Sequence, residues 1–368
     1  MDYRVMAANI DAPSFRAKFR VLERWSYLNA GTAGPVPQTA EDAVRELLHA
    51  QLTEGRVGKA HFDKVIDVAA RARAGYADAL GAAPTEVALT GSTTYGVNTV
   101  LGGLSFSAGE EILTTDQEHP GVLAPLRRVH LAAGVKIRVV PFAELPGEVG
   151  PNTRLVACSH VSWVGGEVMD VAALRATGVP ILLDAAQALG AIAVDVHELG
   201  VDYYAGSGQK WMCGPEGSGA LYVRPDRLDE LEPPFPGYMT VADHDDPLAS
   251  GLAEGSARLD DGFPSPIRSA WAIASMGVLA GAGWTWVHDR AAAGAEQLAE
   301  LLRARGHLVA PRGRSTLVSW SAEDADAEVT RLASHGVIVR SIPSAGLVRA
   351  SVGAWTSEEE IEHLAELA

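Results

Sequence analysis

The stretch Ile181-Leu182-Leu183-Asp184-Ala185-Ala186-Gln187 joins an apolar run to a carboxylate and then to small residues. A nearly continuous apolar run is typical of a strand buried on both faces of a parallel sheet. Ligands bind beyond the carboxyl ends of such strands, so Asp184 stands where a binding site is expected. A helix N-cap at the end of the strand explains the same aspartate equally well when the stretch is taken alone.

Short apolar runs of this kind alternate with amphipathic helical segments from Thr39 to about residue 200. Two helices come first and end at Gly55 and Gly81. We then expect strands at 87–90, 110–114, 136–141, 154–160 and 179–183, with helices near 95–101, 121–133 and 170–177. This alternation predicts an α/β domain with a mostly parallel sheet flanked by helices.

The pattern changes after Arg224, where four prolines bracket a connection and a Gly/Asp-rich stretch follows at 243–262. We place a boundary near residue 235, so that 27–235 forms the large domain and 236–368 a small α+β domain. Residues 1–26 are expected to pack on the small domain as an N-terminal segment. The small domain is expected to contain helices at 266–306 and 323–335, strands at 315–320, 337–342 and 347–352, and a last helix from Thr356.

The composition excludes several classes of protein. With 47% hydrophobic and 21% charged residues in 368, the chain is neither disordered nor fibrous. A net charge of −16 disfavours non-specific binding to nucleic acid or to an anionic membrane, so local arginines must hold any anionic ligand. The two cysteines have no spacing typical of a disulfide framework or of zinc, so we expect no metal. The first 25 residues lack an apolar signal core, and we expect a cytoplasmic protein without a membrane span.

A second stretch, Gly206-Ser207-Gly208-Gln209-Lys210-Trp211, surrounds a lysine with small residues and an aromatic ring. A lysine in such a setting can form a Schiff base with an aldehyde cofactor, whose pyridinium nitrogen usually has an aspartate partner. The alternative is a solvated lysine on a loop, and Asp184 upstream favours the binding site. The spacing matches neither the P-loop nor the dinucleotide-binding motif.

Two further motifs follow predicted strands. Thr90-Gly91-Ser92-Thr93-Thr94-Tyr95-Gly96 opens a helix, where backbone N–H groups and hydroxyls suit a phosphate. Ordinary Ser/Thr capping explains this motif equally well. Thr115-Asp116-Gln117-Glu118-His119-Pro120-Gly121 contains a histidine that either lies flat on an aromatic ring or is merely solvated.

Five motifs in this order resemble the pyridoxal-phosphate enzymes of the class V aminotransferase family: TGSTTYG (90–96), TDQEHPG (115–121), SHVSWVGG (159–166), LLDAAQALG (182–190) and GSGQKWMCGPEGSGALY (206–222). The resemblance covers residues 27–368. This family includes cysteine desulfurases, isopenicillin N epimerase and cysteine/cystine C–S lyases. The resemblance implies the pyridoxal-phosphate-dependent transferase fold (fold type I), pyridoxal phosphate as cofactor and a small amino acid as substrate. It also implies a homodimer with its sites at the subunit interface.

The resemblance also assigns roles to single residues. Lys210 would hold the cofactor as a Schiff base, Asp184 would pair with its ring nitrogen, and His119 would stack on its face. Gln187 would form a hydrogen bond with the phenolic oxygen of the cofactor. The positions that bind phosphate in the family are occupied here by Thr93, Thr94, Ser207 and Gln209.

The chain departs from the family pattern at two positions. Gln209 replaces the histidine that commonly precedes the lysine, which removes a possible positive charge near the phosphate. Phe263 stands where relatives present a Thr or Ser to the phosphate of the neighbouring subunit, and Ser265 is the hydroxyl residue that can take its place.

The C-terminal strands carry two arginines. If Pro343-Ser344-Ala345-Gly346 is a four-residue hairpin loop, Arg340 lies opposite Arg349. Like charges across a ladder are destabilising, so we expect an anion beside them, unless both point to solvent or pair with acids. By resemblance, Arg349 binds the α-carboxylate of the substrate. Arg340 matches a second arginine of the cystine lyase type, which suits a substrate with another carboxylate, and Asn29 is a third substrate-binding candidate.

No cysteine in the small domain precedes Arg349, so the persulfide relay of a desulfurase is not expected, and Cys158 and Cys213 are interpreted as structural. We therefore expect a C–S lyase that performs β-elimination on a cysteine-, cystine- or cysteine S-conjugate-type substrate, with Lys210 as the base. Trp163 fits this branch, because the cystine lyase type has Trp where many relatives have Asn, although simple packing also explains it. The alternatives are an aminotransferase or epimerase on the same scaffold and a non-catalytic ligand sensor.

Overall fold

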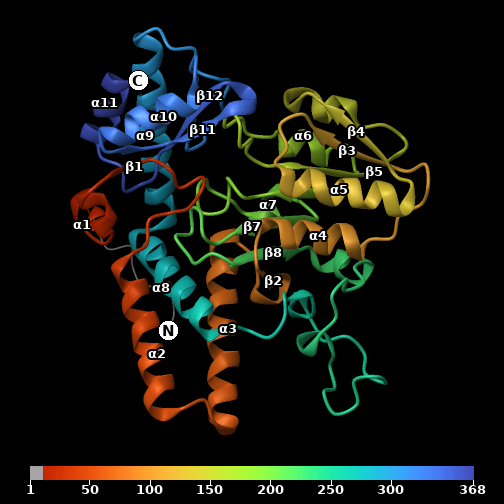
Figure 1. Cartoon of the computed structure of the whole chain (residues 1–368). Coiled ribbons are helices and arrows are strands. Elements are labelled where there is room, and N and C mark those ends of the chain that lie inside the picture. Colours follow the sequence, from red (N-terminus) through yellow and green to blue (C-terminus); the bar gives the residue numbers. More distant parts are fainter. Residues whose placement is uncertain (1–10) are drawn as a thin grey trace.

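The computed structural model describes residues 11–368, and its largest element is a seven-stranded sheet (Figure 1). The strand order is β2 (Val87–Thr90), β8 (Gly219–Val223), β7 (Tyr203–Ser207), β6 (Ile181–Asp184), β5 (Thr153–Ser159), β3 (Glu111–Thr115) and β4 (Lys136–Val140). Only β8 runs antiparallel to its neighbours. The predicted mostly parallel sheet is confirmed, and the carboxyl ends of the other six strands lie at one edge.

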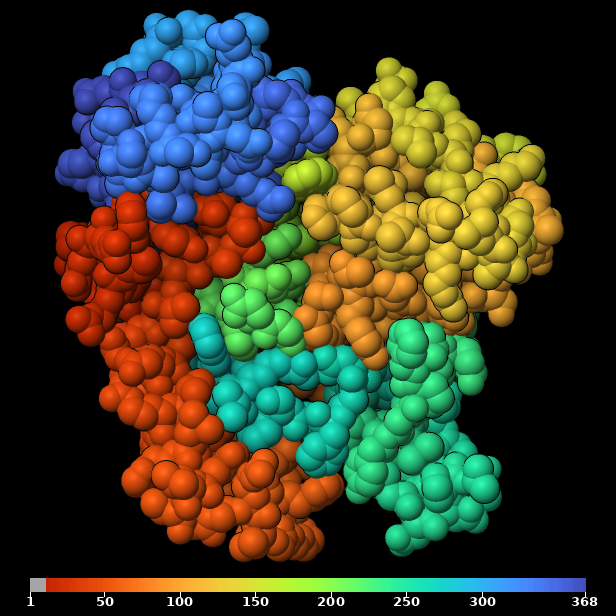
Figure 2. Space-filling model, in the orientation of Figure 1, coloured from red at the N-terminus to blue at the C-terminus, as the bar shows by residue number. Residues whose placement is uncertain are grey.

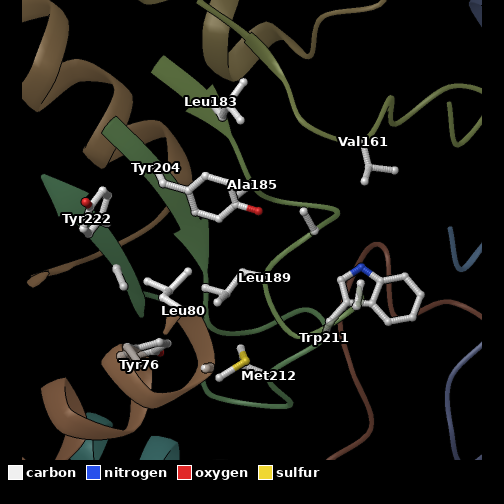
Figure 3. Packing of buried hydrophobic residues seen from close by; sticks show 14 of the residues in the cluster. Tyr76, Leu80, Val161, Leu183, Ala185, Leu189, Tyr204, Trp211, Met212 and Tyr222 are labelled. Atoms are coloured by element: carbon white, nitrogen blue, oxygen red, sulfur yellow. The ribbon is translucent and has the colours of Figure 1, made fainter. Parts of the chain in front are cut away.

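Helices cover both faces of this sheet, as predicted. One face packs against α4 (Thr93–Gly103) and α5 (Pro120–Ala133), which bury their apolar side chains on it. The opposite face packs against α3 (Gly58–Leu80), whose Tyr76 and Leu80 lie beside Tyr204 and Tyr222 of the sheet (Figure 3). The predicted end of α3 at Gly81 is confirmed, because this residue has φ 67°, which glycine adopts without steric cost. Also on this side are α6 (Val171–Arg175) and α7 (Val196–Leu199), while α2 (Gln38–Glu54) packs against the later helix α8 (Pro266–Ala282).

Two strands of the sheet, β7 and β8, were not predicted. Both are buried along their whole length, as are the predicted strands β2 and β6. Unlike those strands, β7 ends in Gly206-Ser207 and β8 begins with Gly219-Ala220, so neither forms a long continuous apolar run. The motif that carries Lys210 therefore lies in the connection between two paired strands.

The small domain has its own core, built on α9 (Trp284–Ala304) and a sheet of order β11 (Arg340–Ile342), β12 (Leu347–Ser351) and β9 (Leu317–Ser321). Two further helices, α10 (Ala325–Ser334) and α11 (Glu358–Leu367), complete it. The predicted hairpin register is confirmed, because Ile342 pairs with Leu347 and Arg340 with Arg349. A separate parallel pair joins β1 (Ser26–Tyr27) to β10 (Val337–Ile338).

The helix that follows the boundary predicted near residue 235 packs with the large domain. This helix, α8 (Pro266–Ala282), contacts α2 and α3 and contributes Met276 and Leu279 to the core of the large sheet (Figure 1). The chain then bends by 81° at Gly283, and α9 enters the small-domain core. The apolar face of α8 thus packs on α2 and α3 of the large domain, and the domain boundary near residue 235 stays a prediction.

No single helix among residues 11–368 is long and apolar enough to cross a membrane; the bent pair α8 and α9 passes that test only by joint length and composition. Both helices contribute side chains to the protein cores. Short 3-10 helices lie at Arg20–Glu23, Pro84–Glu86, Phe142–Glu148, Pro225–Glu230, Tyr238–Thr240, Ser256–Leu259 and Pro343–Ala345.

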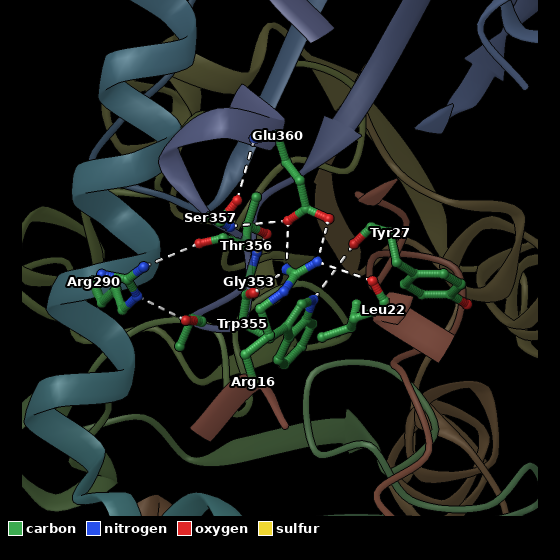
Figure 4. A network of polar contacts seen from close by, with 10 residues as sticks. Arg16, Leu22, Tyr27, Arg290, Gly353, Trp355, Thr356, Ser357 and Glu360 are labelled. Atoms are coloured by element: carbon green, nitrogen blue, oxygen red, sulfur yellow. Dashed lines mark hydrogen bonds and ion pairs between the residues drawn. The ribbon is translucent and has the colours of Figure 1, made fainter. Parts of the chain in front are cut away.

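The described part of the N-terminal segment lies against the small domain (Figure 4). Arg16, at the end of α1 (Ala12–Arg16), forms two bonds of 2.6 and 2.7 Å with the Glu360 carboxylate and donates to the Trp355 carbonyl at 2.8 Å. The ring of Phe19 lies 5.5 Å from that of Trp355. The first ten residues of the predicted segment are outside the described residues.

Candidate active site

The candidate residues from separate motifs meet at the edge formed by the carboxyl ends of the strands. Thr93 follows β2, His119 follows β3, Asp184 ends β6 and Lys210 follows β7. The small domain adds Arg340 and Arg349 from β11 and β12. Figure 2 shows that on this face the green middle of the chain lies in a hollow between the blue small domain, the red N-terminal segment and the orange part of the large domain.

The side chain of Lys210 is largely buried, and its charge state is perturbed. Burial lowers the pKa of Lys210 to about 8; the Asp184 carboxylate opposes this shift, whereas Arg349 and Arg340 add to it. A substantial fraction of the amine is therefore neutral near physiological pH, as a nucleophile or base requires. This partly buried setting differs from that of a fully solvated lysine on a loop.

A tight turn holds the backbone of Lys210. The Lys210 carbonyl accepts a hydrogen bond from the N–H of Cys213 at 3.1 Å, and Cys213 has φ 54°, in the left-handed region that non-glycine residues rarely adopt. Strained backbone of this kind is concentrated at functional sites. Cys213 and Cys158 are both buried, and burial raises the pKa of their thiols, which disfavours the reactive thiolate.

Asp184 is buried at the end of β6. One of its oxygens accepts a hydrogen bond from the N–H of Ala186 at 2.8 Å. Burial raises the pKa of Asp184, and the Lys210 charge and the bond from Ala186 offset part of the shift. No helix begins after this aspartate, since the next helix is α7 at Val196, so the N-cap explanation is wrong. The carboxylate is left to interact with the site.

The candidate phosphate residues gather around the start of α4. Ser92 caps this helix by accepting from the N–H of Tyr95 at 3.1 Å, so the hydroxyls of Thr93 and Thr94 are not needed as caps. The Thr93 and Ser207 hydroxyls lie 2.6 Å apart, which joins the ends of β2 and β7. The Thr94 hydroxyl lies beside the α carbon of Gly121.

Gln187 and Gln209 occupy different environments at this edge. The Gln187 amide donates to the carbonyl of Gly31 at 2.9 Å, and its oxygen accepts from the Trp211 indole at 3.0 Å. One amide N–H of Gln187 thus remains for another acceptor. The side-chain oxygen of Gln209 is buried and has no partner among residues 11–368.

His119 caps α5 and touches the neighbouring loop. Its Nδ1 accepts from the N–H of Gly121 at 3.0 Å, and its ring stands edge-on to Trp163 with centroids 5.2 Å apart. Burial lowers the pKa of His119, and the charges of Lys210, Arg340 and Arg349 lower it further. The ring is therefore neutral at neutral pH, which suits stacking.

The two arginines lie on adjacent strands without acidic partners. Arg349 is 0% exposed, and its Nη1 donates to the carbonyl of Trp163 at 2.6 Å. This burial excludes the alternative that Arg349 points to solvent. Its Nε and Nη2 have no partner among residues 11–368. Burial, with a contribution from Arg340, lowers the pKa of Arg349 to about 9. The Arg340 guanidinium lies 5.7 Å from the centre of the Trp163 ring. A buried cation without a counter-ion is costly, which indicates that an anionic ligand binds beside it.

Sequence reasoning named Asn29 as a substrate-binding candidate but did not predict that its segment, which we call the strap (residues 27–34), covers Arg349. A β carbon on Gly31 would lie 2.8 Å from Nη2 of Arg349 and 2.7 Å from the buried, unpartnered hydroxyl of Ser351, so only glycine fits there. Asn29 pairs with Ser351 in a short bridge and accepts from the Thr32 hydroxyl at 2.8 Å. The paired glycines 31 and 34 were the only local signal of this close approach.

Phe263 and Ser265, which stand where the family presents a Thr or Ser to the neighbouring subunit, contact other parts of the protein than the candidate site residues described above. Phe263 is 49% exposed and packs against Phe62 and Tyr238. Ser265 caps α8 by accepting from the N–H of Arg268 at 3.4 Å. Contact of either residue with a neighbouring subunit stays a prediction. Within residues 11–368, no group of three or more His, Cys, Asp or Glu side chains is arranged to hold a metal ion.

The chain belongs to the aminotransferase class-V family, whose model matches residues 26–364. It is 34% identical over 224 residues to an isopenicillin N epimerase of Streptomyces clavuligerus, an alignment that covers 56% of this chain and 55% of the relative. It is 31% identical over 243 residues to a probable cysteine desulfurase of Methanothermobacter thermautotrophicus, an alignment that covers 62% of this chain and 60% of that relative. These alignments span less than two thirds of each relative's own length.

Solved structures extend the similarity along most of the chain. The cystine C–S lyase C-DES, in complex with its reaction product cysteine persulfide, superimposes with a TM-score of 0.88 at 28% identity, over 95% of this chain and 98% of that one. A C-DES variant with glycine covalently linked to its PLP cofactor gives a TM-score of 0.90 with the same identity and coverage. The predicted fold type I architecture is confirmed.

Pyridoxal phosphate is the cofactor of this family, and the residues present fit it. A lysine of lowered pKa lies near a buried aspartate, and hydroxyls gather at the start of α4. The unpartnered oxygen of Gln209 and the unpartnered indole N–H of Trp163 show that polar groups here lack partners within residues 11–368. Both observations fit a site built around a bound ligand.

Proposed function

We propose that this protein is a pyridoxal-phosphate-dependent C–S lyase that performs β-elimination on a cysteine-, cystine- or cysteine S-conjugate-type amino acid. The observation that carries the proposal is the arginine pair, in which two nitrogens of the fully buried Arg349 have no partner in the described part of the chain and Arg340 lies opposite it. The pair supports binding of an amino acid with a carboxylate at each end. The similarity to C-DES, whose product is cysteine persulfide, supports the same substrate class.

The chain's own residues would share the work as follows. When bound, pyridoxal phosphate supplies an electron sink that acidifies the proton on the α carbon of an amino acid. Lys210 would anchor the cofactor and then remove that proton, which its lowered pKa of about 8 favours. Asp184 would hold a proton on the ring nitrogen, and His119 would keep the ring in place. A thiolate or persulfide would leave from the β carbon, and hydrolysis would give pyruvate and ammonia.

An aminotransferase or epimerase is the second candidate, because it begins with removal of the same α proton. The 34% identity to an isopenicillin N epimerase supports this candidate. A non-catalytic sensor is less compatible with a lysine that has a lowered pKa. A cytoplasmic location stays a prediction.

Product analysis separates the two candidates. The purified protein, loaded with pyridoxal phosphate, should release pyruvate, ammonia and persulfide sulfur from L-cystine, and should transfer no amino group from alanine to an α-keto acid. Amino-group transfer without pyruvate release would identify an aminotransferase. Loss of optical activity of the amino acid, with no other product, would identify an epimerase.

We also propose that the protein is a homodimer with its sites at the subunit interface. Three aromatic rings, which we call the aromatic patch (Phe62, Tyr238 and Phe263), contact one another although they are 38%, 47% and 49% exposed. A contiguous exposed apolar patch is typical of an interaction surface, where aromatic residues carry much of the binding energy.

A charge in the aromatic patch should therefore disrupt the dimer. Phe263→Asp is expected to raise the dissociation constant of the dimer roughly tenfold or more, measured by sedimentation. Leu131→Asp is the matched control, because Leu131 is 63% exposed on α5 and away from the patch. A wild-type protein that is active as a monomer would contradict the proposal.

A further inference from the structure

Glu118 has a buried carboxyl group that the proposed reaction does not use. The residue is 5% exposed, its carboxyl group forms no ion pair with a basic side chain within residues 11–368, and the like-signed Asp184 carboxylate adds to the cost of its charge. Burial raises the pKa of Glu118 to about 7 although three hydrogen bonds oppose the shift. A buried acid without a cation is costly, so its presence beside the candidate site needs an explanation.

The carboxyl group joins the end of β3 to the end of β5. One oxygen accepts from the Thr115 hydroxyl at 2.6 Å and from the N–H of Ser159 at 2.9 Å. The other accepts from the Ser159 hydroxyl at 2.7 Å. Ser159 lies opposite Asp184 in the pairing of β5 with β6, so these bonds fix the 115–119 loop relative to the strand that carries Asp184.

The other residues of this loop are fastened to different elements. Asp116 accepts from the N–H of Phe142 at 3.1 Å. Gln117 donates to Glu167 at 2.8 Å and accepts from the hydroxyl of Ser162, next to Trp163. Thus the side chains of three successive residues bind protein groups, and the fourth, His119, places its ring among the site residues. The spacing of the TDQEH motif follows from this division.

We propose that Glu118 is a positioning residue, which holds the His119 ring at its place over the cofactor by fixing the loop to the end of β5. This inference rests on the proposed function, because it requires His119 to contact the bound cofactor. Glu118 itself touches neither cofactor nor substrate and acts through His119.

The test is a double-mutant cycle on the affinity for pyridoxal phosphate. His119→Ala is expected to weaken binding about three- to tenfold, the range for one ring–ring contact. Glu118→Leu should weaken binding to a similar degree, and the double variant should bind no more weakly than His119→Ala alone, because the two residues act as one unit. The visible circular dichroism of the bound cofactor should change alike in the three variants, since it reports how the ring is held.

Glu118→Gln tests the inference by rescue. Its amide can accept from Thr115 and the backbone of Ser159 and can donate to the Ser159 hydroxyl, so wild-type affinity and dichroism are expected. Asp202→Asn is the control for general destabilisation. Asp202 is a 3% exposed acid that precedes β7, at the opposite end of the strands, where it pairs with Arg224 and Arg227. This variant should lower the melting temperature without changing affinity or dichroism.

Two results would overturn the inference while leaving the proposed function standing. The first is a Glu118→Leu variant that binds pyridoxal phosphate with wild-type affinity although His119→Ala binds it more weakly. The second is a double variant whose loss of affinity equals the product of the two single losses. If Glu118→Leu does not fold, Ser159→Ala, which removes one donor to the carboxyl, enters the same cycle with the same expectations. A His119→Ala variant with unchanged affinity would likewise overturn the inference alone, whereas a wild-type protein that binds no pyridoxal phosphate would overturn the proposed function and this inference together.

Discussion

Lys210→Ala should abolish covalent attachment of pyridoxal phosphate and all turnover. The cofactor can form its Schiff base only with a neutral amine, and burial lowers the pKa of Lys210 to about 8 although the Asp184 carboxylate opposes this shift. The wild-type protein should absorb at roughly 410 to 430 nm, as expected of a protein Schiff base. Borohydride reduction followed by peptide mapping should then label Lys210. The variant should show neither signal.

Lys136→Ala is the matched control, because Lys136 is an exposed lysine on β4, away from the site. It should keep the absorbance and the activity. A Lys210→Ala protein that retains a borohydride-reducible chromophore would show that another lysine holds the cofactor.

The same assignment predicts a pH dependence. The rate at which the apoprotein takes up pyridoxal phosphate should rise with pH and level off above about 8, as the Lys210 amine loses its proton. An ordinary lysine would show a rate that rises until pH is close to its usual pKa of about 10.4. A rate that keeps rising between pH 9 and 10 would contradict the buried setting of Lys210.

Arg349→Ala should reduce kcat/KM for every amino acid substrate by about a hundredfold or more, and Arg340→Ala should act selectively. Arg349 is buried and two of its nitrogens find no partner from residue 11 onward, so its loss should remove a charge-assisted bond to the α-carboxylate that all these substrates share. Arg340→Ala should weaken the binding of cystine by about 1.5 to 3 kcal/mol, which is roughly a tenfold to a hundredfold loss of affinity. The affinity for an S-alkyl cysteine, which lacks the second carboxylate, should not change. Steady-state kinetics with both substrates measures the difference.

Thermal unfolding provides the control for the arginine variants. Because Arg349 is buried without a counter-ion, replacing it with the similarly long Met should not lower the melting temperature, although it should abolish activity. A large loss of stability would indicate that the arginine is structural. Equal losses on the two substrates in Arg340→Ala would show that Arg340 does not contact a second carboxylate.

The sequence was sufficient for those parts of the fold that depend on local patterns. The alternating strands and helices of the large domain follow from periodicity, and the pairing of Arg340 with Arg349 follows from the length of one hairpin loop. The strands β7 and β8 were not predicted because small residues shorten the apolar runs that revealed the equally buried β2 and β6. The packing of α8 on α2 and α3 was not predicted, because it depends on the shapes of helices that lie far apart in the chain.

The candidate site divides in the same way. Lys210 and Asp184 stand out locally, since each is a charge among small or apolar residues. Gly31 and Ser351 do not, because what matters is their contact across 320 positions of the chain. Glu118 was visible as part of a motif, but its bonds to Ser159 depend on the order of strands in the sheet.

The strap and the helix α1 before it also have a consequence for biosynthesis. Arg16 of α1 and Asn29 of the strap are translated before any of their small-domain partners, since Arg16 binds Glu360 and Asn29 pairs with Ser351. These contacts can form only after almost the whole chain has been translated, and contacts of such high sequence separation form slowly. The large domain can assemble first, as domains generally fold as units during synthesis. Closure of the strap over Arg349 is then a late folding event, so a nascent chain stopped before β12 would have a lysine ready for the cofactor but no pocket for a substrate carboxylate.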